Sequence, residues 1–205
     1  MTTDGAAVEP TQPVVPSESL TMLVESLLFV ADEPVTAARL AAALGVELTQ
    51  VETAIAELSV NLQRRGIRLQ QKGDRVQLAT MPEAAAAIER FLGLEVSPRL
   101  SPAALETLAM IAYRQPITRT QLEAVRGVNC DGVLRTLLSR SLIEEQGRLD
   151  AVGRPILFGT TFEFLQYFGL SRVEDLPPLP EALVAELAAR DAQAVASVDD
   201  KTASA

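Results

Sequence analysis

The chain contains an internal repeat in which one short pattern occurs twice, 82 residues apart. Residues 32–36 (DEPVT) align with residues 114–118 (RQPIT), so a proline and a threonine recur at the same spacing. Four further matches continue the alignment: Leu40 with Leu122, Gly45 with Gly127, Val51 with Val133, and Ile55 with Leu137. Proline, threonine and glycine recurring at one fixed offset predict two copies of one small domain.

The first copy begins with a segment of helical period. Its apolar residues fall at positions i, i+3, i+4, i+7 and i+8, which is one face of a helix, and they are Leu20, Leu23, Val24, Leu27 and Leu28. Pro34 should end this helix, and Thr36 is a suitable N-cap for a second helix that Gly45 ends. Thr49 is the expected N-cap of a third helix.

The period of the first copy then changes from helical to alternating. Ile67, Leu69 and Gln71 alternate with other residues, residues 72–74 (KGD) are typical of a turn, and Val76 and Leu78 continue the alternation. These residues predict a hairpin, followed by a closing helix over residues 82–92.

The second copy repeats this order. Ser101 is the expected N-cap of its first helix, Thr118 that of its second, and Gly127 should end the second helix. A third helix is expected around residues 133–138 and strands at residues 142–145 and 156–160, with a longer loop between the strands. A short closing helix is expected over residues 162–168.

Three helices followed by a hairpin form a helix-turn-helix with a wing. The predicted fold class is therefore mainly α with small β-hairpins (α+β), arranged as two tandem winged-helix domains. We expect a disordered leader (1–17), a first domain (18–97), a second domain (98–170) and a largely disordered, acidic tail containing several prolines (171–205).

The composition excludes several classes of enzyme. The chain has no His and one Cys, so a Ser-His-Asp triad, a Cys-His pair and an imidazole or multi-cysteine zinc site are all impossible within it. No phosphate-binding glycine loop or cluster of metal ligands is visible, and we expect no enzymatic activity and no cofactor. Cys130 is interpreted as a cap or as filler in the core.

The charge disfavours a reader of DNA sequence. The net charge is −9, and residues 98–170 carry eight basic and seven acidic groups. The third helix of the first copy would present Glu52 and Glu57, which phosphates repel, and that of the second presents a mixture of Asp131 and Arg135. We therefore expect DNA contact to be indirect or weak at most.

The second copy also contains longer motifs in a fixed order. These are AYRQPITR (112–119), RGVN (126–129), DGVLRTL (131–137), GRPILFGTT (153–161), FLQYFGL (164–170) and LPPL (176–179). Together they closely resemble the ScpB family of segregation and condensation proteins, winged-helix accessory subunits of the bacterial SMC–kleisin complex. The resemblance extends over roughly residues 18–180 and is strongest in the second domain. Phe158 and Cys130 depart mildly from the family pattern.

The resemblance implies a non-catalytic scaffold. Members of this family form homodimers, largely through the first domain, and bind the kleisin subunit ScpA, through which they join the SMC ATPase in chromosome condensation and segregation. On this basis we expect the first domain to dimerise and the second to bind the kleisin, by a helix in a groove or by a strand added to a wing edge.

Candidate contact residues follow from exposed charge and aromatic content. The partner-binding candidates are Arg114, Arg119, Arg154, Pro155, Phe164 and Tyr167. Four of the eight aromatic residues lie within residues 162–168, and one or two of the four are expected to remain exposed because one short helix has only one inward face. The dimer seam is expected to include Leu20, Leu23 and Leu27, although the sequence does not separate core from seam on this helix and most of its leucines are expected to be core.

Two other interpretations remain open from the residues alone. One is a winged-helix transcription regulator, and the other is an adaptor for a different assembly. The first sixteen residues contain no Lys or Arg, and no apolar run reaches the ~18 residues of a membrane span. We therefore expect a cytoplasmic protein with no membrane partner, and the resemblance to the ScpB family implies that it is associated with the nucleoid.

Overall fold

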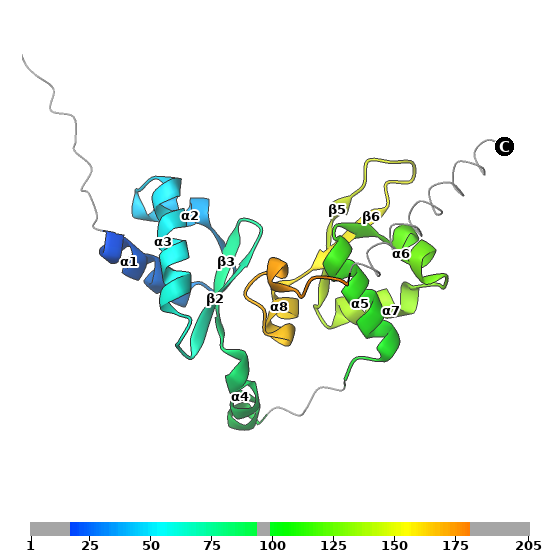
Figure 1. The fold of residues 1–205 in the computed structure, drawn as a ribbon. Helices are drawn as coiled ribbons and strands as arrows, with labels where there is room; N and C mark the ends of the chain where they lie inside the picture. The colour runs from blue at the N-terminus through cyan, green and yellow to red at the C-terminus, as the bar shows by residue number, and fades with distance from the viewer. Residues whose placement is uncertain (1–16, 94–98, 181–205) are drawn as a thin grey trace, which may run out of the picture.

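The computed structural model describes residues 17–93 and 99–180. Figure 1 shows two small domains, each with a bundle of helices beside a short three-stranded sheet. The predicted class, mainly helical with two winged-helix domains, is confirmed. The structure does not describe residues 1–16, 94–98 and 181–205, so the predictions made for most of the leader and the end of the tail lie outside the described residues.

The first domain contains four α-helices and three strands within residues 17–93. In chain order they are α1 (Ser17–Val30), β1 (Val35–Thr36), α2 (Ala37–Leu44), α3 (Leu48–Asn61), β2 (Ile67–Lys72), β3 (Arg75–Thr80), the 3-10 turn η1 (Pro82–Ala84) and α4 (Ala85–Leu92). The antiparallel sheet has the order β1-β3-β2, which leaves β2 at one edge. Helices α1 and α3 pack against each other across the core.

The second domain repeats this architecture. Its elements are α5 (Pro102–Arg114), β4 (Ile117–Thr118), α6 (Arg119–Arg126), α7 (Asp131–Ser139), β5 (Ile143–Arg148), β6 (Ile156–Thr160), α8 (Phe162–Phe168) and the 3-10 turn η2 (Val173–Asp175). The sheet order is β4-β6-β5, so β5 occupies the edge that β2 occupies in the first domain.

The repeat in the sequence corresponds to a repeat in the structure. Strands β1 and β4, and helices α2 and α6, begin and end 82 residues apart. The hydroxyl oxygens of Thr36 and Thr118 accept hydrogen bonds from the backbone N–H three residues later, as N-caps do. Gly45 and Gly127 end their helices with φ of 65° and 70°, a conformation that favours glycine. These four predicted caps are confirmed.

Two local predictions were wrong or incomplete. Helix α3 begins at Leu48 rather than after Thr49, because Gln50 Oε1 accepts a hydrogen bond from the Glu47 backbone N–H at 3.1 Å and fixes Glu47 as the N-cap. The hairpins also proved to be three-stranded sheets. The extra strands, β1 and β4, contain only two residues each and are too short to leave an alternating pattern.

Each domain encloses its own apolar core. In the first domain, Leu20, Val24 and Leu28 of α1 pack with Val51 and Leu58 of α3. In the second domain, Leu108 and Ile111 of α5 pack with Leu137, Phe164 and Leu165. Two candidate contact residues are buried in these cores: Leu20, proposed for the dimer seam, is 4% exposed, and Phe164, proposed for partner binding, is 2% exposed. Neither offers a surface for a contact in this structure.

The second domain extends beyond its expected end at residue 170. Leu170, Val173 and Leu176 pack against the core of the second domain, and the Tyr113 hydroxyl donates a hydrogen bond to the Pro177 carbonyl oxygen at 2.6 Å. Residues 171–180 are thus part of the folded domain rather than of a disordered tail. Prolines at 177, 178 and 180 gave the sequence a linker-like composition although this segment is packed.

Candidate partner-binding grooves and surfaces

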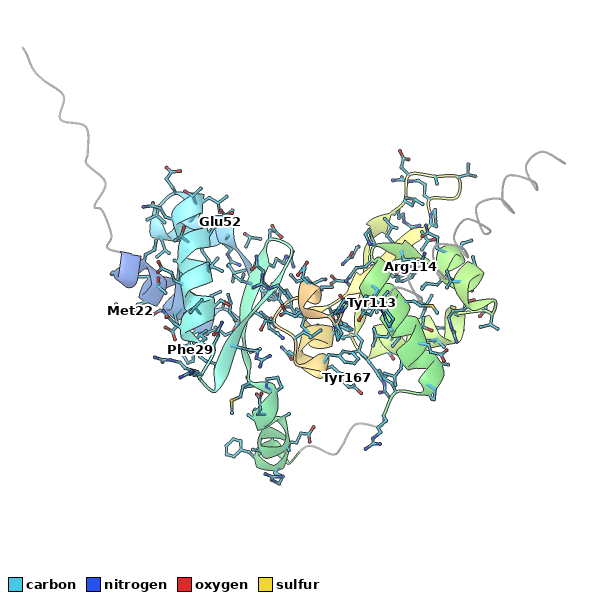
Figure 2. The ribbon with its side chains drawn as sticks, viewed as in Figure 1. Met22, Phe29, Glu52, Tyr113, Arg114 and Tyr167 are labelled. Carbon is cyan, nitrogen blue, oxygen red and sulfur yellow. The ribbon has the colours of Figure 1, made fainter. Side chains whose placement is uncertain are left out.

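Each domain has a groove between its third helix and its wing, at equivalent places in the two copies. The first groove, about 620 Å³, lies between α3 and the β2–β3 hairpin, and the second, about 630 Å³, lies between α7 and the β5–β6 hairpin. Figure 2 shows the side chains of the two domains, with Glu52 labelled on α3 in the first. The charges that line the two grooves differ in sign.

The second groove is basic at its rim and apolar in its floor. Its charged lining residues are Arg119, Arg135, Arg148 and Asp131, whereas those of the first groove are Glu52, Asp74 and Arg172. The apolar part of the lining of the second groove consists of Leu134, Leu138, Pro155, Ile156 and Phe158. An apolar floor with arginines around it suits an amphipathic peptide that carries carboxylates.

A charged pair connects the two helices beside this groove. Arg119, at the start of α6, donates from Nη1 to Asp131 Oδ1 at 2.6 Å, and Asp131 is the first residue of α7. This hydrogen bond, with a second one from Asn129, lowers the pKa of the Asp131 carboxyl below its ordinary value, and the pairing raises the pKa of Arg119. Asp131 therefore stays ionised and neutralises part of the basic rim.

We predict that replacing Arg119 by Gln raises the pKa of the Asp131 carboxyl toward the ordinary value of about 3.9. The folded chain holds this pKa below its unfolded value. The stability that the pair adds to the folded state is therefore fully present above the unfolded pKa and is lost as pH falls through the folded pKa. A pH titration of the carboxyl carbon by NMR measures the change. Arg99→Gln, an exposed arginine outside the groove, is the control and should leave the Asp131 pKa unchanged.

The loop at the tip of the second wing is held by its own hydrogen bonds. Arg148 Nη1 donates to the Arg154 carbonyl oxygen at 3.1 Å, and the Leu149 backbone N–H donates to the Pro155 carbonyl oxygen at 2.9 Å. Arg154 has a φ of 42°, in the left-handed region, and its side chain is exposed. These hydrogen bonds hold the loop so that Pro155 lines the groove and the exposed Arg154 lies beside it.

The structure brings together only some of the predicted contact residues. Arg119 and Pro155 line the second groove and Arg154 adjoins it, whereas Arg114, Phe164 and Tyr167 do not line it. Sequence reasoning missed Arg135 and Arg148 as partners of this site. The helical spacing of Asp131 and Arg135, four residues apart on α7, was the available indication.

Helix α8 exposes two of its aromatic residues, as expected. Tyr167 is 51% and Phe168 42% exposed, and their rings meet edge to face with centroids 5.1 Å apart. Phe162 and Phe164 point into the core. Tyr167 therefore remains a candidate for a protein contact, on a surface separate from the groove.

The outer face of α1 carries several apolar side chains, and no element within residues 17–93 and 99–180 covers it. Phe29 is 80% exposed, Met22 and Val30 are also exposed, and Leu23 is 41% exposed. Figure 2 shows Met22 and Phe29 at the side of the first domain that is far from the second domain. Of the three leucines predicted for a dimer seam, only Leu23 is on this face, because Leu27 packs partly against the core.

Helix α4 projects from the end of the first sheet and buries none of its side chains (Figure 1). Phe91 is 88% exposed and Leu92 is also exposed. The predicted closing helix therefore forms but does not close the core. Its apolar side chains form a second exposed apolar surface of the first domain, uncovered by any of the residues that the structure describes.

Several kinds of site are missing from the part of the chain that the structure describes. Within residues 17–93 and 99–180, no group of three or more Cys, Asp or Glu side chains is placed to hold a metal ion. No helix among these residues has the length and apolarity needed to span a membrane. Cys130 is completely buried in the second core, which agrees with its interpretation as filler.

Comparison with known proteins gives a consistent family match. The family model described as "Segregation and condensation complex subunit ScpB" matches residues 22–179. The "Segregation and condensation protein B" of Moorella thermoacetica is 48% identical over 178 residues, covering 86% of this chain and 91% of the relative. That of Geobacillus thermodenitrificans is 49% identical over 162 residues, covering 78% of each chain.

Solved structures are also similar to this chain. The crystal structure of ScpB from Mycobacterium tuberculosis is 41% identical and covers 76% of this chain and 98% of its own, with a TM-score of 0.37. Another structure is a dimer of an ScpB N-terminal domain complexed with an ScpA peptide. It is 31% identical and covers 36% of this chain and 95% of its own, with a TM-score of 0.34.

Proposed function

The chain belongs to the ScpB family, and we propose that it acts as a homodimeric scaffold that binds the kleisin ScpA and, through it, the SMC ATPase. Members of this family are non-catalytic and work in chromosome segregation and condensation. The main support for this proposal is that the family match extends over both winged-helix domains rather than over one. Association with the nucleoid would follow from membership of that complex.

We assign the dimer seam to the outer face of α1, with a contribution from α4. A stable interface buries about 800 Å² of the solvent-accessible surface of each partner. This is about four times the area that one large aromatic side chain buries. The partly exposed Met22, Leu23, Phe29 and Val30 fall short of that area, so the exposed Phe91 and Leu92 of α4 are natural additions. Both helices belong to the first domain, to which dimerisation was assigned from the family resemblance.

We assign the principal ScpA contact to the groove between α7 and the second wing. Its basic rim contrasts with the net charge of −9 of the whole chain, so an acidic peptide would be attracted to this groove more than to the rest of the surface. A related ScpB N-terminal domain forms a complex with an ScpA peptide. For this reason the equivalent groove of the first domain is also tested as a contact for ScpA.

The competing function is that of a winged-helix transcription regulator. The charges of the first domain oppose it, because Glu52 lies in the first groove. The basic rim of the second groove, where Arg135 of α7 is exposed, would not repel phosphates, so DNA binding is measured alongside ScpA binding. Direct DNA reading would require basic and amide side chains facing outward from α3 or α7. The scaffold proposal leaves DNA contact to other subunits.

Titration of the labelled full chain with the ScpA of the same organism, and separately with duplex DNA, tests the proposal. We expect saturable binding of ScpA at about micromolar concentration or below, and only weak DNA binding that disappears with added salt. Tight binding of one duplex sequence without affinity for ScpA would replace the scaffold with a regulator.

A further inference from the structure

The two domains are joined by hydrogen bonds between β2 and the residues after α8. We call residues 169–172 the strap. The carbonyl oxygens of Gly169, Leu170 and Ser171 each accept a hydrogen bond from β2. The donors are Arg68 Nη1 at 2.7 Å, Gln70 Nε2 at 2.9 Å and the Gln71 backbone N–H at 2.8 Å, in the same order.

The strap covers the open edge of the first sheet. Strand β2 has β3 on one side only, so its outward N–H groups would otherwise face water or another chain. The Gln70 side chain is buried, and its Oε1 also accepts a hydrogen bond from Gln77 Nε2 at 3.0 Å. Residues of β2 therefore use backbone and side-chain donors together to hold the second domain.

An ion pair and a glycine complete the junction. Lys72, at the end of β2, pairs with Glu144 on the edge strand β5 of the second domain. Gly169 has a φ of 67°, and a Cβ atom there would lie 2.7 Å from Pro82 Cγ. A larger residue at position 169 would therefore strain the turn after α8 and push the domains apart.

The junction is polar and loosely packed. A cavity of about 510 Å³ lies at it, with Arg64 and Arg65 of the first domain and Ser171 and Arg172 of the second among its lining residues. Small polar interfaces between domains usually permit relative motion, whereas large apolar ones do not. The contacts at this junction are thus able to form and break without disturbing either core.

We propose that the strap and the edge of β2 form a reversible latch, which is closed in the free chain and opens without unfolding of either domain. The closed latch sets the orientation of the basic groove relative to the outer face of α1. It thereby sets how the two grooves of a dimer are presented to ScpA, a consequence that rests on the proposed function. Opening releases the basic groove of each chain from this fixed orientation and exposes the edge of β2.

Hydrogen exchange of the Gln71 backbone amide, followed by NMR on the full chain alone, tests the latch. We expect this amide to be protected, yet to exchange at least about tenfold faster than the amide of Ile55 in the middle of α3, because opening needs less free energy than unfolding. An unprotected Gln71 amide would mean that the latch does not form. Exchange as slow as that of Ile55 would mean that it does not open.

Charge reversal provides variants that leave both cores intact. Lys72→Glu and Glu144→Lys should each accelerate exchange of the Gln71 amide several-fold, and the double variant should restore the slower rate because it restores an opposite-charge pair. Unchanged exchange rates in both single variants would mean that the ion pair does not stabilise the closed latch. Without restoration in the double variant, the single effects would not report a pairwise contact.

A matched pair of glycine substitutions separates strain from contact. Gly169 and Gly127 have φ of 67° and 70°, but only a Cβ atom at residue 169 meets another residue within 4 Å. Gly169→Ala should accelerate exchange at Gln71, and Gly127→Ala should not, although both strain a helix end. Equal effects would contradict the role of the Pro82 contact. None of these measurements involves ScpA, so their failure would leave the proposed function standing.

Discussion

Replacing Phe29 by Glu is expected to turn the proposed dimer into a monomer. Phe29 is the most exposed apolar side chain on the outer face of α1, and a carboxylate at this position would have to lose its hydration to enter a seam. We expect the dimer dissociation constant to rise at least about 100-fold, since central aromatic side chains carry much of the energy of an interface. Sedimentation velocity over a range of concentrations measures this change.

The control for this prediction is Val152→Glu. Val152 is fully exposed in the loop at the tip of the second wing, so the same apolar-to-acidic change occurs there without touching α1 or α4. Both variants should keep the helical content and melting temperature of the wild type, because neither side chain belongs to a core. A Phe29→Glu chain that remains dimeric would place the seam elsewhere, and Phe91→Glu on α4 would then be the variant to measure.

Reversing charge at the second groove is expected to remove most of the affinity for ScpA. Arg135 lines the groove and Arg154 adjoins it, and both side chains are exposed, so neither change leaves a buried charge. We expect Arg135→Glu and Arg154→Glu to weaken binding about tenfold each and the double variant about 100-fold, if the two effects add. Fluorescence anisotropy with labelled ScpA gives these constants at one fixed salt concentration.

Two further variants make the groove prediction specific. Arg99→Glu reverses an exposed arginine of the second domain outside the groove and should bind ScpA as the wild type does. Glu52→Arg changes the equivalent groove of the first domain. If Glu52→Arg alters the affinity while Arg135→Glu does not, the principal contact belongs to the first domain and our assignment is wrong.

Local chemistry explains why much of the fold was predictable. Thr36, Thr118, Gly45 and Gly127 each have a backbone role that few other residues perform, so their repetition at one spacing predicted the order of the helices. Because the two copies repeat, the elements identified in one copy also predicted the elements of the other. A predicted helix boundary was wrong where the N-cap is an uncommon residue for that role, as at Glu47 before α3.

The faces of the most apolar helices were not predictable in the same way. Five of the seven residues of helix α8 are aromatic or aliphatic, so its sequence does not distinguish the inward Phe164 from the outward Tyr167. Helix α1 is similar, since Val24 and Leu28 face the core while Phe29 faces outward. Only the neighbouring elements decide which side of such a helix is buried.

Contacts between the domains left the weakest trace in the sequence. Arg68 and Gln70 look like ordinary polar residues of a half-exposed strand, and their acceptors are backbone carbonyls about 100 residues away. A carbonyl acceptor has no residue type, so no motif records the pairing. The groove was partly visible because Arg119, Arg154 and Pro155 lie in the motifs that resemble the ScpB family.

Light scattering after size exclusion, on this chain alone and mixed with the ScpA of the same organism, tests the scaffold function. The chain has a mass of 22.0 kDa, so we expect a dimer of twice that mass when it is alone and a heavier, co-eluting species with ScpA. A chain that elutes unchanged in the presence of ScpA would contradict the scaffold function while leaving the two winged-helix domains in place.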